Sequence, residues 1–211
     1  DWAELDPLAL WQALAACVRH VADSLPVGQH IAAVAVASMG EAGVPLDAGG
    51  QPLYPIIAWF DPRSQPQTEK LRQQFGAEAI HRVTGQKLRH IFAAPKLLWL
   101  KENCPAVIER LAAWLSLEDY ILWRLTGAAA TDYSIASRTM LFDQRRTDWW
   151  PDMLAACGIS ADVLPRPVPS GTVIGAVTDA AARETGLLVG TPVATGGHDH
   201  LCGALAVGAV D

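Results

Sequence analysis

Residues 196–200, with the sequence GGHDH, hold the closest group of potentially reactive side chains in the chain. They follow a short apolar segment, 192–195, that predicts a strand, and they precede a predicted helix over 201–208. In a turn of this kind, the N–H groups of Gly196 and Gly197 and a helix N-terminus would attract an anion. Asp199 could accept a proton from a substrate hydroxyl, or it could only cap the helix.

The same segment also allows an interpretation as a metal site. His198, Asp199, His200 and Cys202 are all potential ligands of zinc or a related metal. Neighbouring side chains on a turn are expected to point in different directions, however, and no second group of ligands is obvious elsewhere in the sequence. We therefore predict that this segment holds no metal.

Polar residues also follow two other predicted strands. Residues 38–41, SMGE, end the apolar segment 31–39, and ligands of α/β proteins bind where strands end. Glu41 could accept hydrogen bonds from hydroxyl groups, or it could be a solvated hairpin glutamate. Residues 59–63, WFDPR, could form a wall with an internal ion pair, or a core tryptophan with a turn-capping aspartate.

The elements that would position these residues alternate between helices and strands. Asp6 and Pro7 suit the start of a helix that continues to Val21 with apolar residues at helical spacing. The segment 31–39 has the pattern of a strand buried on both faces. Helices are further expected over 67–75, 95–103, 106–114, 117–125, 149–157 and 179–185, strands over 55–59, 171–177 and 192–195, a hairpin over 44–55, a loop entering a strand over 130–143, and irregular chain over 165–169. This order predicts an α/β domain with a helical insertion over about 65–164.

Composition excludes several classes of protein. The 211 residues are 51% hydrophobic and 18% charged, which is too apolar for a disordered chain, yet no apolar run is long enough to cross a membrane. A net charge of −6 disfavours a nucleic acid partner. The four cysteines form no CxxC pair, and no signal peptide is evident, so we expect reduced thiols and a cytoplasmic protein.

Four stretches, in this order, resemble the FGGY family of carbohydrate kinases. They are SMGEAGVPLDAGGQPLYPIIAWFDPRS, with its W-x-D-x-R; FAAPKLLWLKENCPAVIER, similar to [FS]-[SA]-x-[PT]-K-x-x-W-[LI]; LEDYILWRLTG followed by TDYSIASRTMLFD; and VATGGHDHLCGALAVG, similar to G-G-x-D. The resemblance covers nearly the whole chain. It implies an actin-like, ribonuclease H-like fold, and ATP-dependent phosphorylation of a sugar or polyol hydroxyl with Mg²⁺.

The resemblance also implies the role of each matched residue. Asp199 would be the general base that deprotonates the attacking hydroxyl, and Gly196 and Gly197 would lie near the phosphates. The residues expected to bind the sugar are Met39, Gly40, Glu41, Trp59, Asp61 and His200.

Four positions depart from the family pattern, so the resemblance does not give the substrate. Gly40 stands where Arg or His is common, and His198 and His200 stand where Gly and Asn or Gln are frequent. Ile91 stands where glycerol kinases have an aromatic residue. A ketopentose, a hexulose or a sugar alcohol is therefore expected rather than glycerol.

The family's D-x-G-T-[ST] hairpin and its C-terminal nucleotide domain do not occur in these 211 residues. We therefore expect this chain by itself to be inactive, and its strand over 31–37, which lacks the hairpin as a neighbour, to favour a homodimer. Two alternatives stay open at this point: a non-catalytic sugar-binding module, and a metal-dependent hydrolase that uses residues 198–202.

Overall fold

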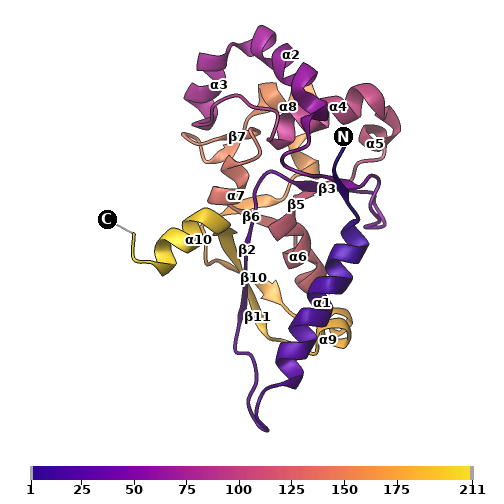
Figure 1. Ribbon diagram of the computed structural model, residues 1–211, viewed down its shortest axis with the longest axis vertical. Coiled ribbons are helices and arrows are strands. Elements are labelled where there is room, and N and C mark those ends of the chain that lie inside the picture. The colour runs from indigo at the N-terminus through magenta and orange to yellow at the C-terminus, as the bar shows by residue number, and fades with distance from the viewer. Residues whose placement is uncertain (1, 210–211) are drawn as a thin grey trace.

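The computed structural model describes residues 2–209, and helices and short sheets alternate along the chain (Figure 1). The helices are α1 Pro7–Asp23, α2 Gln65–Phe75, α3 Ala77–Thr84, α4 Ala93–Asn103, α5 Pro105–Glu109, α6 Leu117–Thr126, α7 Tyr133–Ser137, α8 Pro151–Cys157, α9 Asp179–Thr185 and α10 Asp199–Ala206, with short 3₁₀ helices at Pro62–Ser64 and Ala161–Val163. The strands are β1 Glu4–Leu5, β2 Val34–Ser38, β3 Gly43–Leu46, β4 Ile56–Ile57, β5 Ala113–Ser116, β6 Ala130–Asp132, β7 Phe142–Asp143, β8 Asp148–Trp149, β9 Arg166–Val168, β10 Val173–Ala176 and β11 Pro192–His198. Among the helices described, none is both long and apolar enough to cross a membrane.

The sheet that positions the candidate site has the order β10-β11-β2. Strand β11 is antiparallel to β10 and parallel to β2, and the parallel ladder runs from Val193 opposite Val34 to His198 opposite Ser38. Because the two strands run in the same direction, their carboxyl ends lie side by side. The segments that follow Ser38 and His198 therefore start from neighbouring positions.

Two hydrophobic cores divide the molecule along its long axis (Figure 1). One lies around α4 and α8, with Leu97 and Met153 fully buried in it. The other lies between the sheet and helices α1, α6 and α9, and it contains Trp11, Leu122 and Val193. Helix α6 packs against β11 and β2, so it belongs to the sheet core although it lies within the predicted insertion over about 65–164. That insertion, as a domain boundary, stays a prediction.

Helix α1 is the element that the sequence predicts best. The Asp6 side chain accepts hydrogen bonds from the N–H groups of Leu8 and Ala9, and Pro7 is the first helical residue. Trp11 and Ala15 are buried one turn apart, as the helical spacing requires. Helix α6 ends at Gly127 in the left-handed conformation, as predicted, and the structure adds a capping box at Ser116 where it begins.

Several other expectations are wrong. The segment 106–114 is not one helix, because α5 ends at Glu109 and the following residues form β5, which pairs with β3. The segment 130–143 is not mainly a loop, because it holds β6 and α7. The 165–169 segment contains strand β9. The predicted 44–55 hairpin, by contrast, is present in a short form, with an antiparallel bridge between Leu46 and Pro52 and backbone hydrogen bonds across the turn.

Strand β2 is not buried on both faces, contrary to expectation. Its residues alternate between half-buried and exposed, with Ala35 and Ala37 exposed. Within residues 2–209, β2 pairs only with β11, and its other edge carries no strand. An edge position explains the exposure, because no neighbour covers that side.

The predicted turn at 196–197 is also wrong, because β11 continues through both glycines to His198. The β2–β11 register shifts between Thr195 and Gly197, and a Cβ on Gly196 would overlap the carbonyl group of Val36 on β2. A glycine is therefore required for this close approach of two backbones.

We expect Gly196→Ala to lower Tm by about 3–10 °C, because the added methyl group forces the strands apart. Gly203→Ala in α10 is the matched control, since its Cβ would meet nothing within 4 Å. That variant should melt at or slightly above the temperature of the parent protein. Equal melting temperatures for the two variants, by differential scanning fluorimetry, would contradict the assigned register.

Candidate active site

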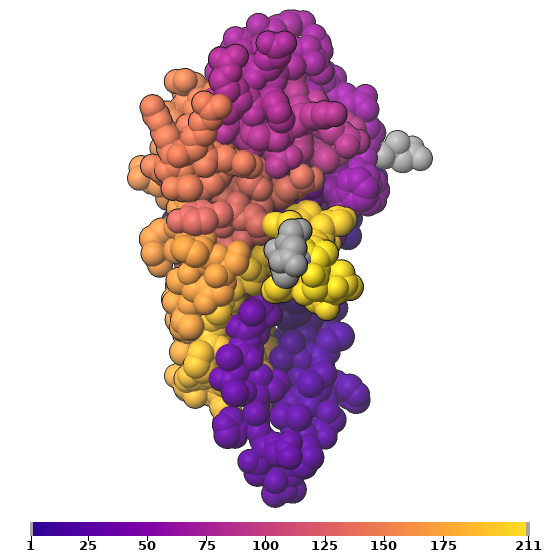
Figure 2. Space-filling model, turned by 90° about the vertical axis from the view of Figure 1, so that its left-hand side faces the viewer, coloured from indigo at the N-terminus to yellow at the C-terminus, as the bar shows by residue number. Residues whose placement is uncertain are grey.

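A cavity of about 440 Å³ lies beside the carboxyl ends of β2 and β11. Its lining comes from three parts of the chain: Gln86, Ser134, Ser137, Arg138, His198, His200 and Leu201. Helix α10, yellow in Figure 2, projects from the molecule between its mainly helical half and the half that contains α1. His198 and His200 line this cavity, whereas neither Asp199 nor any of residues 38–41 does. The two groups that the sequence predicts separately, 38–41 and 196–200, are neighbours because Ser38 pairs with His198 at the ends of β2 and β11.

Asp199 is the first residue of α10, and its side chain is half exposed. The N-cap residue is His198, so the alternative that Asp199 serves as the N-cap is wrong. Oδ1 of Asp199 accepts the backbone N–H of His200 at 2.8 Å and lies 2.8 Å from Nδ1 of the same residue. Within residues 2–209, Oδ2 of Asp199 has no hydrogen-bond partner, and it is therefore free to accept a proton.

Glu41 is buried and paired, which excludes the alternative of a solvated glutamate. Nε of Arg138 donates to Oε1 of Glu41 at 2.8 Å, and Nη2 of Arg138 donates to the same oxygen. Nη1 of Arg138 donates to Oε1 of Gln86 at 3.1 Å, and its guanidinium lies over the Phe92 ring. A side chain on Gly40 would collide with Arg138, so the glycine leaves room for this ion pair.

Lys96 anchors the backbone at Glu41, and the sequence had suggested no role for it. Its side chain is fully buried, and Nζ donates to the carbonyl oxygens of Glu41 at 2.8 Å and Ile57 at 3.3 Å. Burial lowers the pKa of Lys96 to about 7, although the nearby Glu41 and Asp61 carboxylates favour its charged form. Lys96 thereby ties the end of the 38–41 segment to β4.

Trp59 and Asp61, both predicted to lie near the sugar, do not line this cavity. Trp59 is 44% exposed and packs edge-on against Phe60, so it is not a core tryptophan. Asp61 is fully buried and accepts hydrogen bonds from Arg63 and from the N–H of Ala3. Burial alone would raise the pKa of Asp61, but these hydrogen bonds outweigh it and hold the pKa at about 2. The predicted internal ion pair is therefore present, and the Asp61 carboxylate is used in this pair with Arg63.

The predicted phosphate-binding glycines have a different environment from the one expected. The N–H of Gly196 donates to Oε1 of Glu118 at 2.8 Å, so this group points into the protein. Burial, with a further contribution from Asp132, raises the pKa of Glu118 to about 9. Oε2 of Glu118 and Oδ1 of Asp119 are buried without a partner among the described residues. Glu118 is therefore protonated at neutral pH and holds the end of β11 as a neutral group.

Glu118→Gln tests this protonation state. The folded pKa of Glu118 lies above the ordinary value of 4.5, so the native stability that depends on its proton is present below pH 4.5 and is lost as pH rises toward 9. Glutamine is neutral at every pH and still accepts the N–H of Gly196. We expect the variant to gain at least about 2 °C in Tm at pH 8 and less at pH 5. A pH-independent difference between variant and parent would show that Glu118 is ionised.

The potential metal ligands of the 198–202 segment also differ from expectation. Nε2 of His198, a carboxylate oxygen of Asp199 and Nδ1 of His200 lie within 4.8 Å of one another, whereas Cys202 is outside the group. The expectation that these side chains point in different directions is therefore wrong for three of the four. Burial lowers the pKa of His198, so its imidazole is neutral at pH 7.

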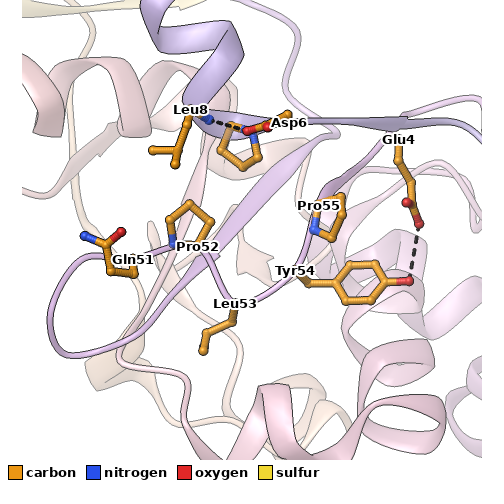
Figure 3. A pocket seen from close by; sticks show the side chains of 9 residues that line it. Glu4, Asp6, Leu8, Gln51, Pro52, Leu53, Tyr54 and Pro55 are labelled. Atoms are coloured by element: carbon orange, nitrogen blue, oxygen red, sulfur yellow. Dashed lines mark hydrogen bonds between the residues drawn. The ribbon is translucent and has the colours of Figure 1, made fainter.

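A second cavity, of about 470 Å³, lies between the start of α1 and the 51–55 segment (Figure 3). Its carboxylates are already bonded: Asp6 caps α1, and Glu4 accepts from Tyr54 and Arg63. The rest of the lining is mostly proline and leucine. Both carboxylates therefore take part in structural contacts, Asp6 in the cap of α1 and Glu4 in the pair with Arg63.

Comparisons with known proteins show the family of the chain. The model of the N-terminal domain of the FGGY family of carbohydrate kinases matches residues 1–206. The chain belongs to this family. L-fuculokinase of Escherichia coli K12 is 35% identical over 208 residues, which are 99% of this chain and 44% of that protein. Autoinducer-2 kinase of Klebsiella pneumoniae is 34% identical over 98% of this chain and 39% of that protein.

Among solved structures, xylulose kinase from Rhodospirillum rubrum superposes on this FGGY chain with a TM-score of 0.95 and 31% identity. The superposition covers 100% of this chain and 43% of that kinase. It confirms the predicted actin-like α/β fold. The FGGY chain spans less than half the length of the relatives named here.

Arg138 and Lys96 are the site residues that the sequence analysis missed. Both lie inside stretches that resemble the family, ASRTM for Arg138 and APKLLW for Lys96. The available signal was a lysine with apolar residues on both sides, AAPKLLW, because a charge in such a position is buried only where it is paired or hydrogen-bonded. No comparable signal in the sequence pairs Arg138 with Glu41, 97 positions away.

Proposed function

We propose that this chain forms the sugar-binding part of a kinase that transfers a phosphoryl group from ATP to a hydroxyl of a sugar or polyol. One observation carries the proposal. An anchored carboxylate, Glu41, and a half-exposed one with a free oxygen, Asp199, follow the adjacent ends of parallel strands beside a cavity. The family relationship supports the same reaction, because the relatives include kinases of fuculose and xylulose.

In this proposal the two carboxylates have separate roles. Oδ2 of Asp199 takes the proton of the attacking hydroxyl. Glu41 accepts a hydrogen bond from a second hydroxyl, and its position is fixed by Arg138 and, through the backbone, by Lys96. His200 lines the cavity, and Gly40 lies against Arg138 and His198, which also line it. Met39 and Trp59 do not line it, so they would contact the sugar only from outside the cavity.

The double glycine of this chain does not fit a nucleotide phosphate. The N–H of Gly196 is directed at Glu118, and β11 is a continuous strand at Gly196 and Gly197. ATP would supply the phosphoryl group and Mg²⁺ would neutralise its charge. The steps assigned to this chain are those on the acceptor side, namely binding, orientation and removal of the hydroxyl proton.

The substrate class follows from the volume and polarity of the site. Gly40 has no side chain to occupy the space that Arg138 fills beside the cavity. Ile91 is buried. The polar groups at or beside the cavity, Gln86, Ser134, Ser137, Arg138 and Glu41, suit a molecule with several hydroxyls. We propose a ketopentose, a hexulose or a sugar alcohol as the acceptor.

Glu41→Gln in the complete gene product tests the acceptor site. Loss of the charged acceptor and of the Arg138 pair is expected to raise the KM for the sugar about tenfold to a hundredfold. ADP release would be measured with a panel of acceptors that includes L-fuculose, D-xylulose and sugar alcohols. Glu109→Gln, at an exposed residue that ends α5, is the matched control.

An unchanged KM in Glu41→Gln would show that Glu41 does not bind the sugar. Sugar binding by calorimetry without sugar-dependent ADP release would instead favour the non-catalytic sugar-binding module. The two results separate a wrong residue from a wrong class of function.

We also propose that the protein is a cytoplasmic homodimer. Cys17, Cys104, Cys157 and Cys202 are all free thiols, which suits a reducing compartment.

A further inference from the structure

Three side chains at the junction of β11 and α10 converge on one point. Oδ1 of Asp199 lies 3.6 Å from Nε2 of His198 and 2.8 Å from Nδ1 of His200. The ligand atoms of all three residues lie within 4.8 Å of one another. Among residues 2–209, no other group of three or more His, Cys, Asp or Glu side chains meets this condition.

The change from strand to helix produces this convergence. In a continuous strand the side chains of His198 and His200 would lie on one face and Asp199 on the other. Because β11 ends at His198 and α10 begins at Asp199, the three side chains turn toward a common side instead. The two imidazole rings stack with their centroids 4.9 Å apart.

The two histidines approach from opposite environments. The His198 side chain is 10% exposed, and its backbone N–H donates to Oγ of Ser134 at 2.8 Å, which fixes it against α7. The His200 side chain is 83% exposed, so solvent rather than packed protein surrounds most of its ring. One ligand is therefore held in place, and another can adjust to an incoming ion.

We propose that His198, Asp199 and His200 form a binding site for a divalent transition metal of the zinc class, and that a metal bound there occupies the carboxylate that the proposed reaction uses as its base. Two imidazole nitrogens and one carboxylate oxygen are ligands that zinc prefers. Mg²⁺ is bound by oxygen ligands, so the site selects against it.

The distances suit such an ion. Ligand atoms about 2.1 Å from a tetrahedral zinc lie roughly 3.4 Å apart, between the two separations measured from Oδ1 of Asp199. Small rotations of His200 complete the set and leave a fourth position for water. The metal-binding part of the inference is independent of the proposed function, whereas the inhibition rests on it.

Titration of the untagged chain with Zn²⁺ in excess Mg²⁺, by isothermal calorimetry, tests the site. We expect one equivalent of Zn²⁺ to bind, and His198→Gln and His200→Gln each to weaken binding at least about tenfold. His30→Gln, at an exposed residue outside the group, and Cys202→Ser should leave the affinity unchanged. Absence of binding, its retention in both histidine variants, or its loss in Cys202→Ser would overturn the proposal.

Co²⁺ absorption of the wild-type chain gives a result that does not depend on how the variants fold. A tetrahedral or five-coordinate Co²⁺ spectrum without a thiolate band is expected, and a thiolate band or an octahedral aqueous spectrum would count against the site.

The second arm uses sugar-dependent ADP release by the complete gene product at saturating Mg²⁺. Micromolar Zn²⁺ should inhibit the reaction, a chelator should reverse it, and His200→Gln should resist it relative to its own zinc-free rate. Zinc that binds at the site without inhibiting an active kinase would overturn the inhibitory role. Zinc binding in a protein with no kinase activity would contradict the proposed function alone.

Discussion

Asp199→Asn is expected to lower kcat about 10²–10⁴-fold in the complete gene product and to leave the affinity for the sugar nearly unchanged. The amide keeps the size of the side chain, and its oxygen can still accept the N–H of His200. It cannot take a proton from the attacking hydroxyl. Coupled measurement of ADP release gives kcat, and calorimetric titration with the sugar gives the affinity.

Asp23→Asn is the control for the loss of one carboxylate, because Asp23 is exposed at the end of α1. That variant should have the kcat of the parent protein. A kcat for Asp199→Asn within tenfold of the parent would mean that another group removes the proton.

Arg63→Met should produce the largest loss of stability. Arg63 and Asp61 are both nearly inaccessible to solvent, and Arg63 also pairs with Glu4 and lies over the rings of Trp2 and Trp99. Methionine fills similar space but leaves the Asp61 carboxylate buried without its partner. The expected cost is about 3–5 kcal/mol, which lowers Tm by roughly 6–20 °C in thermal unfolding.

The exposed pair of Arg72 and Glu69 supplies the matched control. Both side chains are about half exposed, so Arg72→Met should change the free energy of unfolding by less than about 1 kcal/mol. Similar melting temperatures for the two variants would contradict a structural role of the buried pair.

The same pair predicts a dependence on acid pH. The folded pKa of Asp61, about 2, lies below the ordinary value of 3.8, so its contribution is present above pH 3.8 and is lost as pH falls toward 2. Arg63→Met should reduce this part of the acid dependence.

Local signals account for the parts of the fold that the sequence predicts correctly. Helix α1 starts at an aspartate cap followed by proline, and α6 starts at a capping box and ends at Gly127. Each signal acts within a few residues, and no distant contact opposes it. The elements therefore form where the sequence indicates.

Strand β5 shows why other elements could not be predicted. Its residues 113–116 continue an apolar pattern that is also compatible with a helix, and they become a strand because β3, more than 60 positions earlier, pairs with them. Such pairing is a tertiary effect that overrides local preference.

The candidate site shows the same limit. The sequence indicates reactive residues at 38–41 and at 196–200, but no local sequence pattern predicts that β2 and β11 are neighbours. The resemblance to a known family supplied that link. The directions of His198 and His200 depend on where strand gives way to helix, and this boundary lies two residues before the predicted start of the helix.

The parallel pairing of β2 and β11 also bears on how the protein reaches its native state. Val34 and Val193, the first pair of this ladder, lie about 160 positions apart, so the ladder forms only when a very long loop closes. The contacts between α2 and α4 or between α4 and α8 span much shorter separations. Folding slows as contacts become less local, so we expect the helical half to form early. Asp199 and Glu41 then come together at the last step, and a chain that has recovered its helices still lacks the candidate site.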